Sequence, residues 1–299
     1  MLETLQVWPT PVPSYTEWIK PSPRLQQHSE TSFTSTPATP QKDTTLHLPR
    51  LLFLHGGGTN ARIFRSQCRG LRARLSPYFR IVFAEAPFYT TPGPDVVSVY
   101  EKWGPFRAWF PPGYGVGNSY NATVPISDSP AASKIVLSSI EQSIEAAMAE
   151  DDHAGGTGAW MGLLGFSQGA KMAASLLLRQ QNTIPGPNRV KSGIDYRFAV
   201  LLAGRAPMVS LAQEDETWFP GCGAGFEPPL HLPTIHVHGM KDPGLPLHRE
   251  LLDYGCEYGS ARLIEWDGEH RVPIRSKDVM AVVDAMLDIA RETGVIGRF

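Results

Sequence analysis

The sequence has little of three things: cysteine, unbalanced charge and long apolar runs. Its 299 residues include only three cysteines, whose odd number and wide spacing argue against a disulfide framework. The formal net charge of −2 gives no electrostatic reason to expect nucleic acid or an anionic membrane surface as a partner. No apolar run is long enough to cross a bilayer, and the first residues do not resemble a secretory signal. We therefore expect a cytoplasmic protein without a membrane span.

Proline, threonine and serine are plentiful near the N-terminus. Residues 1–48 are rich in them and show no sustained periodicity. Such a stretch buries too little apolar surface to offset the entropy lost on ordering it. The composition predicts a disordered or loosely docked tail over residues 1–48, in which Trp8 or Trp18 could contact the domain, and one domain over residues 49–299.

From Leu51 onward, short apolar runs alternate with amphipathic stretches. The apolar runs are continuous, as in strands buried on both faces of a parallel sheet. The pattern predicts an α/β fold, with a mostly parallel, doubly wound sheet and helices on both faces. We expect strands at residues 50–54, 80–84, 161–164, 198–202, 234–238 and 262–266. Helices are expected near residues 61–75, 134–149, 168–181, 246–257 and 276–291.

One long segment, residues 88–133, fits neither pattern. It is rich in glycine and proline and contains Trp103, Phe106, Trp109 and Phe110. Loops of this length inside compact domains are often lids or binding loops. The four aromatic residues are therefore candidates for a substrate pocket, although the same rings could fill the core beneath the loop.

The strongest motif is Gly165-Phe166-Ser167-Gln168-Gly169. It follows an expected strand and opens an expected helix, which is the context of a nucleophilic serine on a sharp turn. The helix N-terminus adds positive potential where an oxyanion would form. Ser167 is therefore the candidate nucleophile, and a chance match in a glycine-rich chain is the alternative.

A second motif, residues 55–58 (His-Gly-Gly-Gly), follows the first expected strand. Consecutive glycines let backbone N–H groups turn toward a developing negative charge. We expect the N–H groups of Gly57 and Gln168 to form an oxyanion hole. A phosphate-binding loop is the rival interpretation, but no Gly-Lys-Ser/Thr sequence follows.

A nucleophilic serine needs a histidine base and an acid that orients it, in the chain order Ser, acid, His. Asp242 follows one expected strand and His270 follows the last, so they are the candidates for the acid and the base. Alternative acids are Asp267 and Glu269, which flank His270 in the sequence. A metal bound by His236, His238 and Asp242 is a further alternative.

Together these stretches resemble the fungal FSH-type serine hydrolases, a branch of the α/β-hydrolase superfamily. The resemblance rests on residues 54–60, 83–87, 165–170, 237–242 and 268–273. It implies an α/β-hydrolase fold, a Ser167-Asp242-His270 triad, and no metal or organic cofactor. It also implies an esterase or thioesterase, of a kind that in fungal secondary metabolism releases a polyketide acyl chain. Glu85 departs from the family, where aspartate is commoner.

The sequence leaves the substrate and the partner open. The same triad could serve acyl transfer or cyclisation, or the fold could serve a non-catalytic binding protein. The substrate could be a small molecule or an acyl group bound to an acyl carrier domain of a synthase. Arg62, Arg65, Arg69 and Arg72 recur on one face of an expected helix, where they could dock an acidic carrier or simply be solvated.

Overall fold

The computed structural model describes residues 43–111, 130–183, 193–209, 211 and 229–297. Most of the expected tail lies outside these residues. Asp43 belongs to the same compact unit as the rest of the described chain and forms an ion pair with Arg80 at 2.7 Å. Arg80 also donates a hydrogen bond to Thr45. Residues 43–48, which the composition placed in the tail, therefore belong to the domain.

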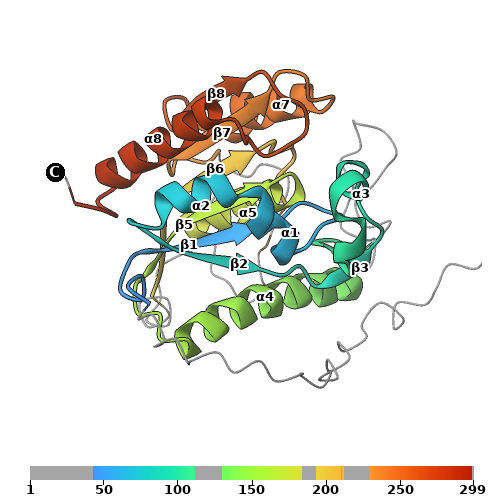
Figure 1. Ribbon diagram of the computed structural model, residues 1–299, viewed down its shortest axis with the longest axis horizontal. Helices are drawn as coiled ribbons and strands as arrows, with labels where there is room; N and C mark the ends of the chain where they lie inside the picture. The colour runs from blue at the N-terminus through green and yellow to red at the C-terminus, as the bar shows by residue number, and fades with distance from the viewer. Residues whose placement is uncertain (1–42, 112–129, 184–192, 210, 212–228, 298–299) are drawn as a thin grey trace, which may run out of the picture. The chain divides into compact units, whose positions relative to one another are not determined.

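A six-stranded sheet forms the centre of the domain (Figure 1). Its order is β2-β1-β5-β6-β7-β8, and all neighbouring strands are parallel. The strands are β1 (Arg50–Leu54), β2 (Arg80–Ala84), β5 (Trp160–Phe166), β6 (Ile194–Leu202), β7 (Thr234–Gly239) and β8 (Ala261–Trp266). The predicted parallel α/β sheet is confirmed, and the six expected strands lie within these bounds.

Helices cover both faces of the sheet. One face is covered by α1 (Ala61–Gln67), α2 (Arg69–Leu75) and α8 (Ser276–Glu292). The other is covered by α4 (Pro130–His153), α5 (Gln168–Asn182) and α7 (Leu245–Gly255). Among the described residues, no helix combines the length and the apolar composition that a membrane-spanning segment needs.

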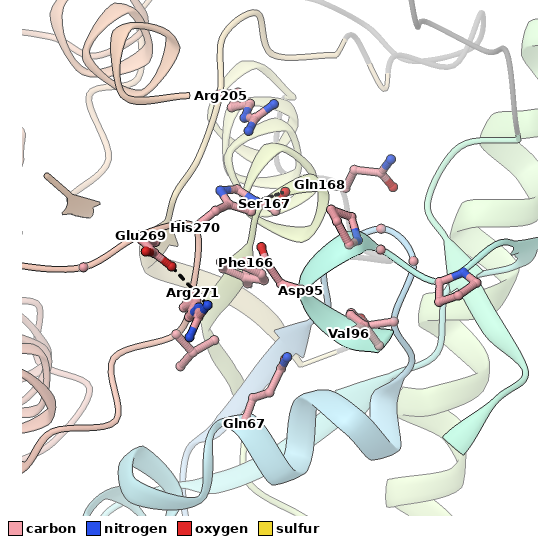
Figure 2. A pocket seen from close by; sticks show the side chains of 18 of the residues that line it. Gln67, Asp95, Val96, Phe166, Ser167, Gln168, Arg205, Glu269, His270 and Arg271 are labelled. Atoms are coloured by element: carbon pink, nitrogen blue, oxygen red, sulfur yellow. Dashed lines mark hydrogen bonds and ion pairs between the residues drawn. The ribbon is translucent and has the colours of Figure 1, made fainter. Parts of the chain in front are cut away.

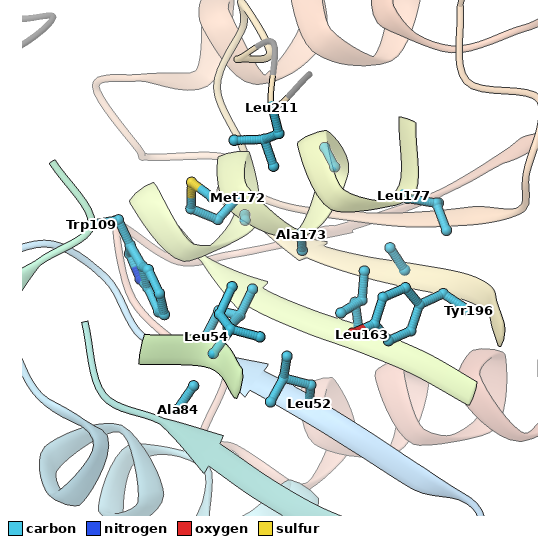
Figure 3. Close-up of a cluster of buried hydrophobic side chains, with 14 of the residues drawn as sticks. Leu52, Leu54, Ala84, Trp109, Leu163, Met172, Ala173, Leu177, Tyr196 and Leu211 are labelled. Carbon is cyan, nitrogen blue, oxygen red and sulfur yellow. The ribbon is translucent and has the colours of Figure 1, made fainter. Parts of the chain in front are cut away.

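The continuous apolar runs of the strands pack against both helical layers. In β1, Leu52 and Leu54 face α5, as Figure 3 shows, whereas Leu51 and Phe53 face the opposite layer. All four side chains are buried because successive residues of a strand point to opposite faces. The sheet is thus covered on both faces, which is the arrangement of the α/β-hydrolase fold.

The expected helix over residues 61–75 is instead two helices. The backbone leaves the α conformation at Cys68, between α1 and α2, with φ −82° and ψ 11°. The four arginines therefore do not form one stripe on a single helix. Arg62 stacks over Trp103 at 4.3 Å and Arg65 over Phe83 at 4.8 Å, so these side chains have intramolecular partners.

The segment 88–133 does contain secondary structure, contrary to the sequence prediction. Its described part forms strand β3 (Phe88–Thr90), helix α3 (Pro94–Tyr100), the 3₁₀ turn η2 (Glu101–Trp103) and strand β4 (Phe106–Ala108). β3 and β4 pair antiparallel. Elements of three to seven residues are too short for a hydrophobic period to be recognised in a sequence. Residues 112–129 lie outside the described part.

The strand order places a reversal between β1 and β5. The chain runs from β1 outward to β2, and then returns to form β5 on the other side of β1. Ligands of open α/β sheets bind beyond the carboxyl ends of the strands at such a reversal. Gly57 follows β1 and Ser167 follows β5, so both candidate residues lie at this point.

Candidate active site

Ser167 stands at a strained turn between β5 and α5. Its φ of 53° and ψ of −115° lie in a region that residues with a Cβ rarely adopt. Its own N–H donates to the carbonyl of Leu202 at 2.9 Å, and its carbonyl accepts from the N–H groups of Ala170 and Lys171. The surrounding hydrogen bonds hold the strained conformation, which turns the hydroxyl out of the sheet.

The two glycines of the motif are required by close backbone approach. A Cβ on Gly165 would lie 2.1 Å from the carbonyl oxygen of Gly169. A Cβ on Gly169 would lie 2.0 Å from the carbonyl oxygen of Leu54. Both obstacles are backbone atoms, which cannot move aside as a flexible side chain would. Glycine at these positions therefore lets α5 start directly against β1 and β5.

The structure brings Ser167, His270 and Asp242 into one hydrogen-bonded chain, part of which Figure 2 shows. His270 Nδ1 lies 2.6 Å from Asp242 Oδ2. His270 Nε2 lies 2.9 Å from Ser167 Oγ. With its proton on Nδ1, His270 donates to the carboxylate and accepts from the serine hydroxyl. This is the geometry in which a histidine can take the proton of a nucleophilic serine.

Backbone hydrogen bonds between two loops hold the acid next to the histidine. After β7, the N–H of Met240 donates to Trp266 at 3.0 Å and the N–H of Lys241 donates to Gly268 at 2.8 Å. A Cβ on Gly239 would lie 2.5 Å from the carbonyl oxygen of Glu269. The loop after β7, with Asp242, and the loop after β8, with His270, are therefore tied together at short range.

Asp242 is held as a buried carboxylate. Its Oδ1 accepts from the N–H of Gly244 at 2.7 Å, and its Oδ2 faces His270. Burial raises the pKa of Asp242, but the hydrogen bonds to His270 and Gly244 have the opposite and larger effect. The pKa of Asp242 is therefore below its usual value. The rival acids face elsewhere: Asp267 pairs with Lys241 and Glu269 with Arg271.

The backbone N–H groups of Gly57 and Gln168 are the candidates for an oxyanion hole. Neither the N–H of Gly57 nor that of Gln168 has an acceptor among the described residues. A Cβ on Gly57 would lie 2.6 Å from the side-chain carbon Cδ of Gln168, so the two residues are in contact. Unpaired N–H groups are the donors that stabilise a developing negative charge.

The short elements of the insertion hold the glycine loop. Gly58 has φ +73°, and a Cβ there would lie 2.3 Å from the nitrogen of Gly93. The N–H of Gly58 donates to the backbone carbonyl of Arg107 at 2.9 Å. The carbonyl of Gly58 accepts from the N–H of Gly93 at 3.0 Å. His55 is fully buried, and its carbonyl accepts from the indole N–H of Trp109 at 2.7 Å. The insertion thus fixes the backbone that carries Gly57.

A cleft of about 1630 Å³ opens around Ser167 and His270. Of the four predicted pocket aromatics, Phe110 lines it, whereas Trp103, Phe106 and Trp109 do not. Trp109 lies fully buried in the core against α5, as Figure 3 shows. An aromatic ring fills a core or a pocket equally well, so only the path of the loop decided between them.

One group of described residues has donor atoms close enough together to hold a metal ion. The atoms belong to Asp242, His248 and His270 and lie within 4.8 Å of one another. His270 is already hydrogen-bonded to both Asp242 and Ser167. His236 and His238 are not in the group, and His236 Nε2 lies 3.3 Å from Cys256 Sγ. This differs from the metal alternative drawn from the sequence.

Three buried histidines predict a loss of stability in mild acid. Burial lowers the pKa of His236 to about 3, of His238 to about 4 and of His248 to about 3. The unfolded chain has a histidine pKa of about 6.5, so below that pH it binds more protons than the folded protein. The free energy of unfolding should therefore fall as the pH drops from 7 to 5, by up to about 1.4 kcal/mol per pH unit for each histidine.

Denaturant unfolding at several pH values measures this slope. Both ring nitrogens of His238 lack a hydrogen-bond partner among the described residues, so His238→Leu removes a titrating group without breaking a bond. This variant should have a shallower pH dependence than the unchanged protein. The exposed His153 provides the control, His153→Leu. If the free energy of unfolding of His238→Leu depended on pH as steeply as that of the unchanged protein, the buried histidines would not explain the loss of stability.

Three residues near Ser167 were not singled out from the sequence. His248 Nε2 lies 3.7 Å from Asp242 Oδ2, and Lys171 and Arg205 line the cleft. Arg205 follows the carboxyl end of β6, where functional residues of such sheets gather, so the strand-end rule could have found it. Lys171 lies one helical turn after Ser167, a spacing that could also have drawn attention.

Comparison with known proteins shows the family of this chain. The family model described as "Serine hydrolase (FSH1)" matches residues 45–282. The esterase pigG of Monascus ruber is 53% identical over 275 residues, which cover 86% of this chain and 96% of that protein. The probable esterase azaC of Aspergillus niger is 51% identical over 260 residues, covering 87% and 92%. The family model thus matches most of the chain, and these relatives are about half identical to it. The chain therefore belongs to the serine hydrolase (FSH1) family.

Proposed function

We propose that this serine hydrolase cleaves a carboxylic ester or acyl thioester through an acyl-enzyme on Ser167. The observation that carries the proposal is the chain of hydrogen bonds from Ser167 Oγ through His270 to Asp242. The free N–H groups of Gly57 and Gln168 support it, because an acyl transfer needs donors for the oxyanion. The esterase names of the fungal relatives favour ester substrates.

The first half of the reaction forms the acyl-enzyme. Ser167 Oγ attacks the carbonyl carbon while His270 Nε2 takes the hydroxyl proton. Asp242 keeps the imidazole in the required tautomer and stabilises its positive charge. The N–H groups of Gly57 and Gln168 bind the oxyanion of the tetrahedral intermediate. The intermediate collapses, the C–O or C–S bond breaks, and His270 returns the proton to the leaving alcohol or thiol.

The second half releases the acid. Water attacks the acyl carbon and gives a proton to His270 Nε2. The bond to Ser167 Oγ then breaks, the serine recovers its proton, and a carboxylic acid leaves. We propose a polyketide-type acyl chain of fungal secondary metabolism as the natural substrate, free or carried on an acyl carrier domain. A nucleophile of the substrate in place of water would give cyclisation or acyl transfer, which product analysis by mass spectrometry separates from hydrolysis.

Covalent labelling tests whether Ser167 is an activated nucleophile. A fluorophosphonate should add once per chain, on the peptide that contains Ser167. His270→Ala should slow the labelling strongly, because the hydroxyl then lacks its base. Peptide mass spectrometry locates the adduct. Labelling at another residue, or equal labelling in His270→Ala, would overturn the proposal.

A further inference from the structure

Two cationic side chains lie in the cleft next to Ser167. Lys171 follows Ser167 by one turn of α5, and Arg205 follows the end of β6. Both line the cleft that also contains Ser167 and His270. Figure 2 shows Arg205 alongside the helix that begins at Ser167. Two positive charges therefore lie in the cleft in which the proposed reaction takes place.

Nothing in the described part of the chain neutralises these two charges. Neither side chain has a carboxylate within ion-pair distance or a hydrogen-bond acceptor there, and the buried Nε of Arg205 has no partner. Other cations of the cleft differ: Lys241 pairs with Asp267 at 2.7 Å, and Arg271 pairs with Glu269 at 3.0 Å. The unpaired Arg69 and Arg275 are exposed to solvent, whereas Lys171 and Arg205 are half-buried.

Local structure holds Arg205 in this place. A Cβ on Gly244 would lie 2.7 Å from Nη2 and 2.8 Å from Nε of Arg205, so the guanidinium lies directly against Gly244. The next residue, Ala206, donates its N–H to the carbonyl of Leu247 at 3.1 Å. Gly244 itself donates to Asp242, so the arginine is anchored to the loop that holds the acid.

The unneutralised pair has an energetic cost. Burial and the charge of Arg205 both lower the pKa of Lys171 from its usual value. Half-buried like charges without a counter-ion destabilise a fold, whereas an anion between them would relieve both desolvation and repulsion. A guanidinium adds a planar pair of donors that fits a carboxylate or a phosphate, and an ammonium adds a point charge.

We propose that Lys171 and Arg205 form a subsite for an anionic oxygen group of the substrate. This inference rests on the proposed function, since it assigns the substrate of the same cleft. Two parts of a substrate could supply the anion: a carboxylate on the acyl chain, or the phosphodiester of a pantetheine arm in the leaving group. The subsite recognises the chemistry that they share.

The test compares charged and uncharged substrates of equal length. One arm uses 4-nitrophenyl half-esters of dicarboxylic acids of increasing length, each with its methyl-capped neutral counterpart. The other arm uses acyl-coenzyme A and the N-acetylcysteamine thioester of the same acyl group, which lacks the phosphates. In the arm that matches the natural anion, Lys171→Met and Arg205→Met should each lower the charged-to-neutral ratio of kcat/KM about tenfold.

Matched variants separate a local role from a change in net charge. Lys277→Met on α8 and Arg262→Met on β8 remove the same charges from exposed or partly exposed positions outside the cleft, and should leave both ratios unchanged. Arg205→Lys should restore part of the ratio. Circular dichroism and thermal unfolding check that each variant is folded.

The outcomes distinguish this inference from the proposed function. A ratio that neither cleft variant changes in either arm overturns the subsite. Absence of turnover with every substrate contradicts the proposed function but leaves the subsite open to a direct measurement. Calorimetry on Ser167→Ala then compares a dicarboxylic half-amide with its methyl-capped counterpart, and coenzyme A with pantetheine. Tighter binding of the charged ligand in either pair, lost in Arg205→Met, supports the subsite, and equal binding within both pairs overturns it.

Discussion

Ser167→Ala is expected to lower kcat for an acyl ester on the order of 10⁵-fold or more. The substitution removes the oxygen on which the proposed acyl-enzyme forms, while His270 keeps its bond to Asp242. The remaining turnover would come from binding and from the N–H groups of Gly57 and Gln168. Steady-state kinetics on a 4-nitrophenyl ester measure the loss. Alanine keeps the Cβ of serine, so the fold should persist.

The control for this prediction is a hydroxyl of the same helix. Ser175 lies on α5, two turns after Ser167, and donates to the carbonyl of Lys171 at 2.8 Å. Ser175→Ala, which also removes the acceptor of the Val209 N–H, should lower the free energy of unfolding by about 1–3 kcal/mol and leave the order of magnitude of kcat unchanged. Activity retained in Ser167→Ala, measured on protein free of contaminating esterase, would refute the proposed nucleophile.

Asp242→Asn is expected to lower kcat about 10⁴-fold with little change in substrate binding. An amide in place of the carboxylate can donate to His270 Nδ1, and the imidazole then carries its proton on Nε2 and no longer accepts from Ser167. The positive charge formed on His270 during the reaction also loses its counter-ion. Asn has the same shape as Asp and can still accept from Gly244 N–H, so the turn after β7 should remain.

The loop after β8 offers a matched control. Asp267 is close to His270 in the sequence but forms its ion pair with Lys241. Asp267→Asn should therefore change kcat by less than about threefold, as is usual for a surface ion pair. If Asp267→Asn and Asp242→Asn lowered kcat equally, the assignment of Asp242 would be wrong. kcat and KM measured separately show whether the loss lies in the chemical step.

The local parts of this fold could be predicted because they depend on short-range patterns. The strands at residues 50–54 and 80–84 have the predicted bounds because each is an arginine followed by four apolar residues. The turn at Ser167 was recognisable because the glycines on both sides permit a close approach of backbone atoms. The order of Ser167, Asp242 and His270 was informative because each follows the end of a strand. Parallel strands bring those ends to one edge.

Other features depended on where distant segments meet. The helix over residues 61–75 is interrupted at Cys68, which no residue of that stretch signals. Trp109 was a candidate for the pocket because it is aromatic, yet its side chain is buried in the core. The insertion returns to the glycine loop there, and the indole N–H donates to the carbonyl of His55.

The sequence by itself determined where the candidate catalytic groups lie along the chain: a serine on a glycine-flanked turn, an acid and a histidine beyond later expected strands, and a glycine loop beyond the first. These follow from local backbone conformation and from chain order. Only the tertiary structure decided which charges remain unpaired among the described residues. Lys171 and Arg205 come from different elements, and whether a carboxylate lies within reach of either is a matter of packing between them. Electrostatic neutralisation depends on distances in space, which a linear sequence does not contain.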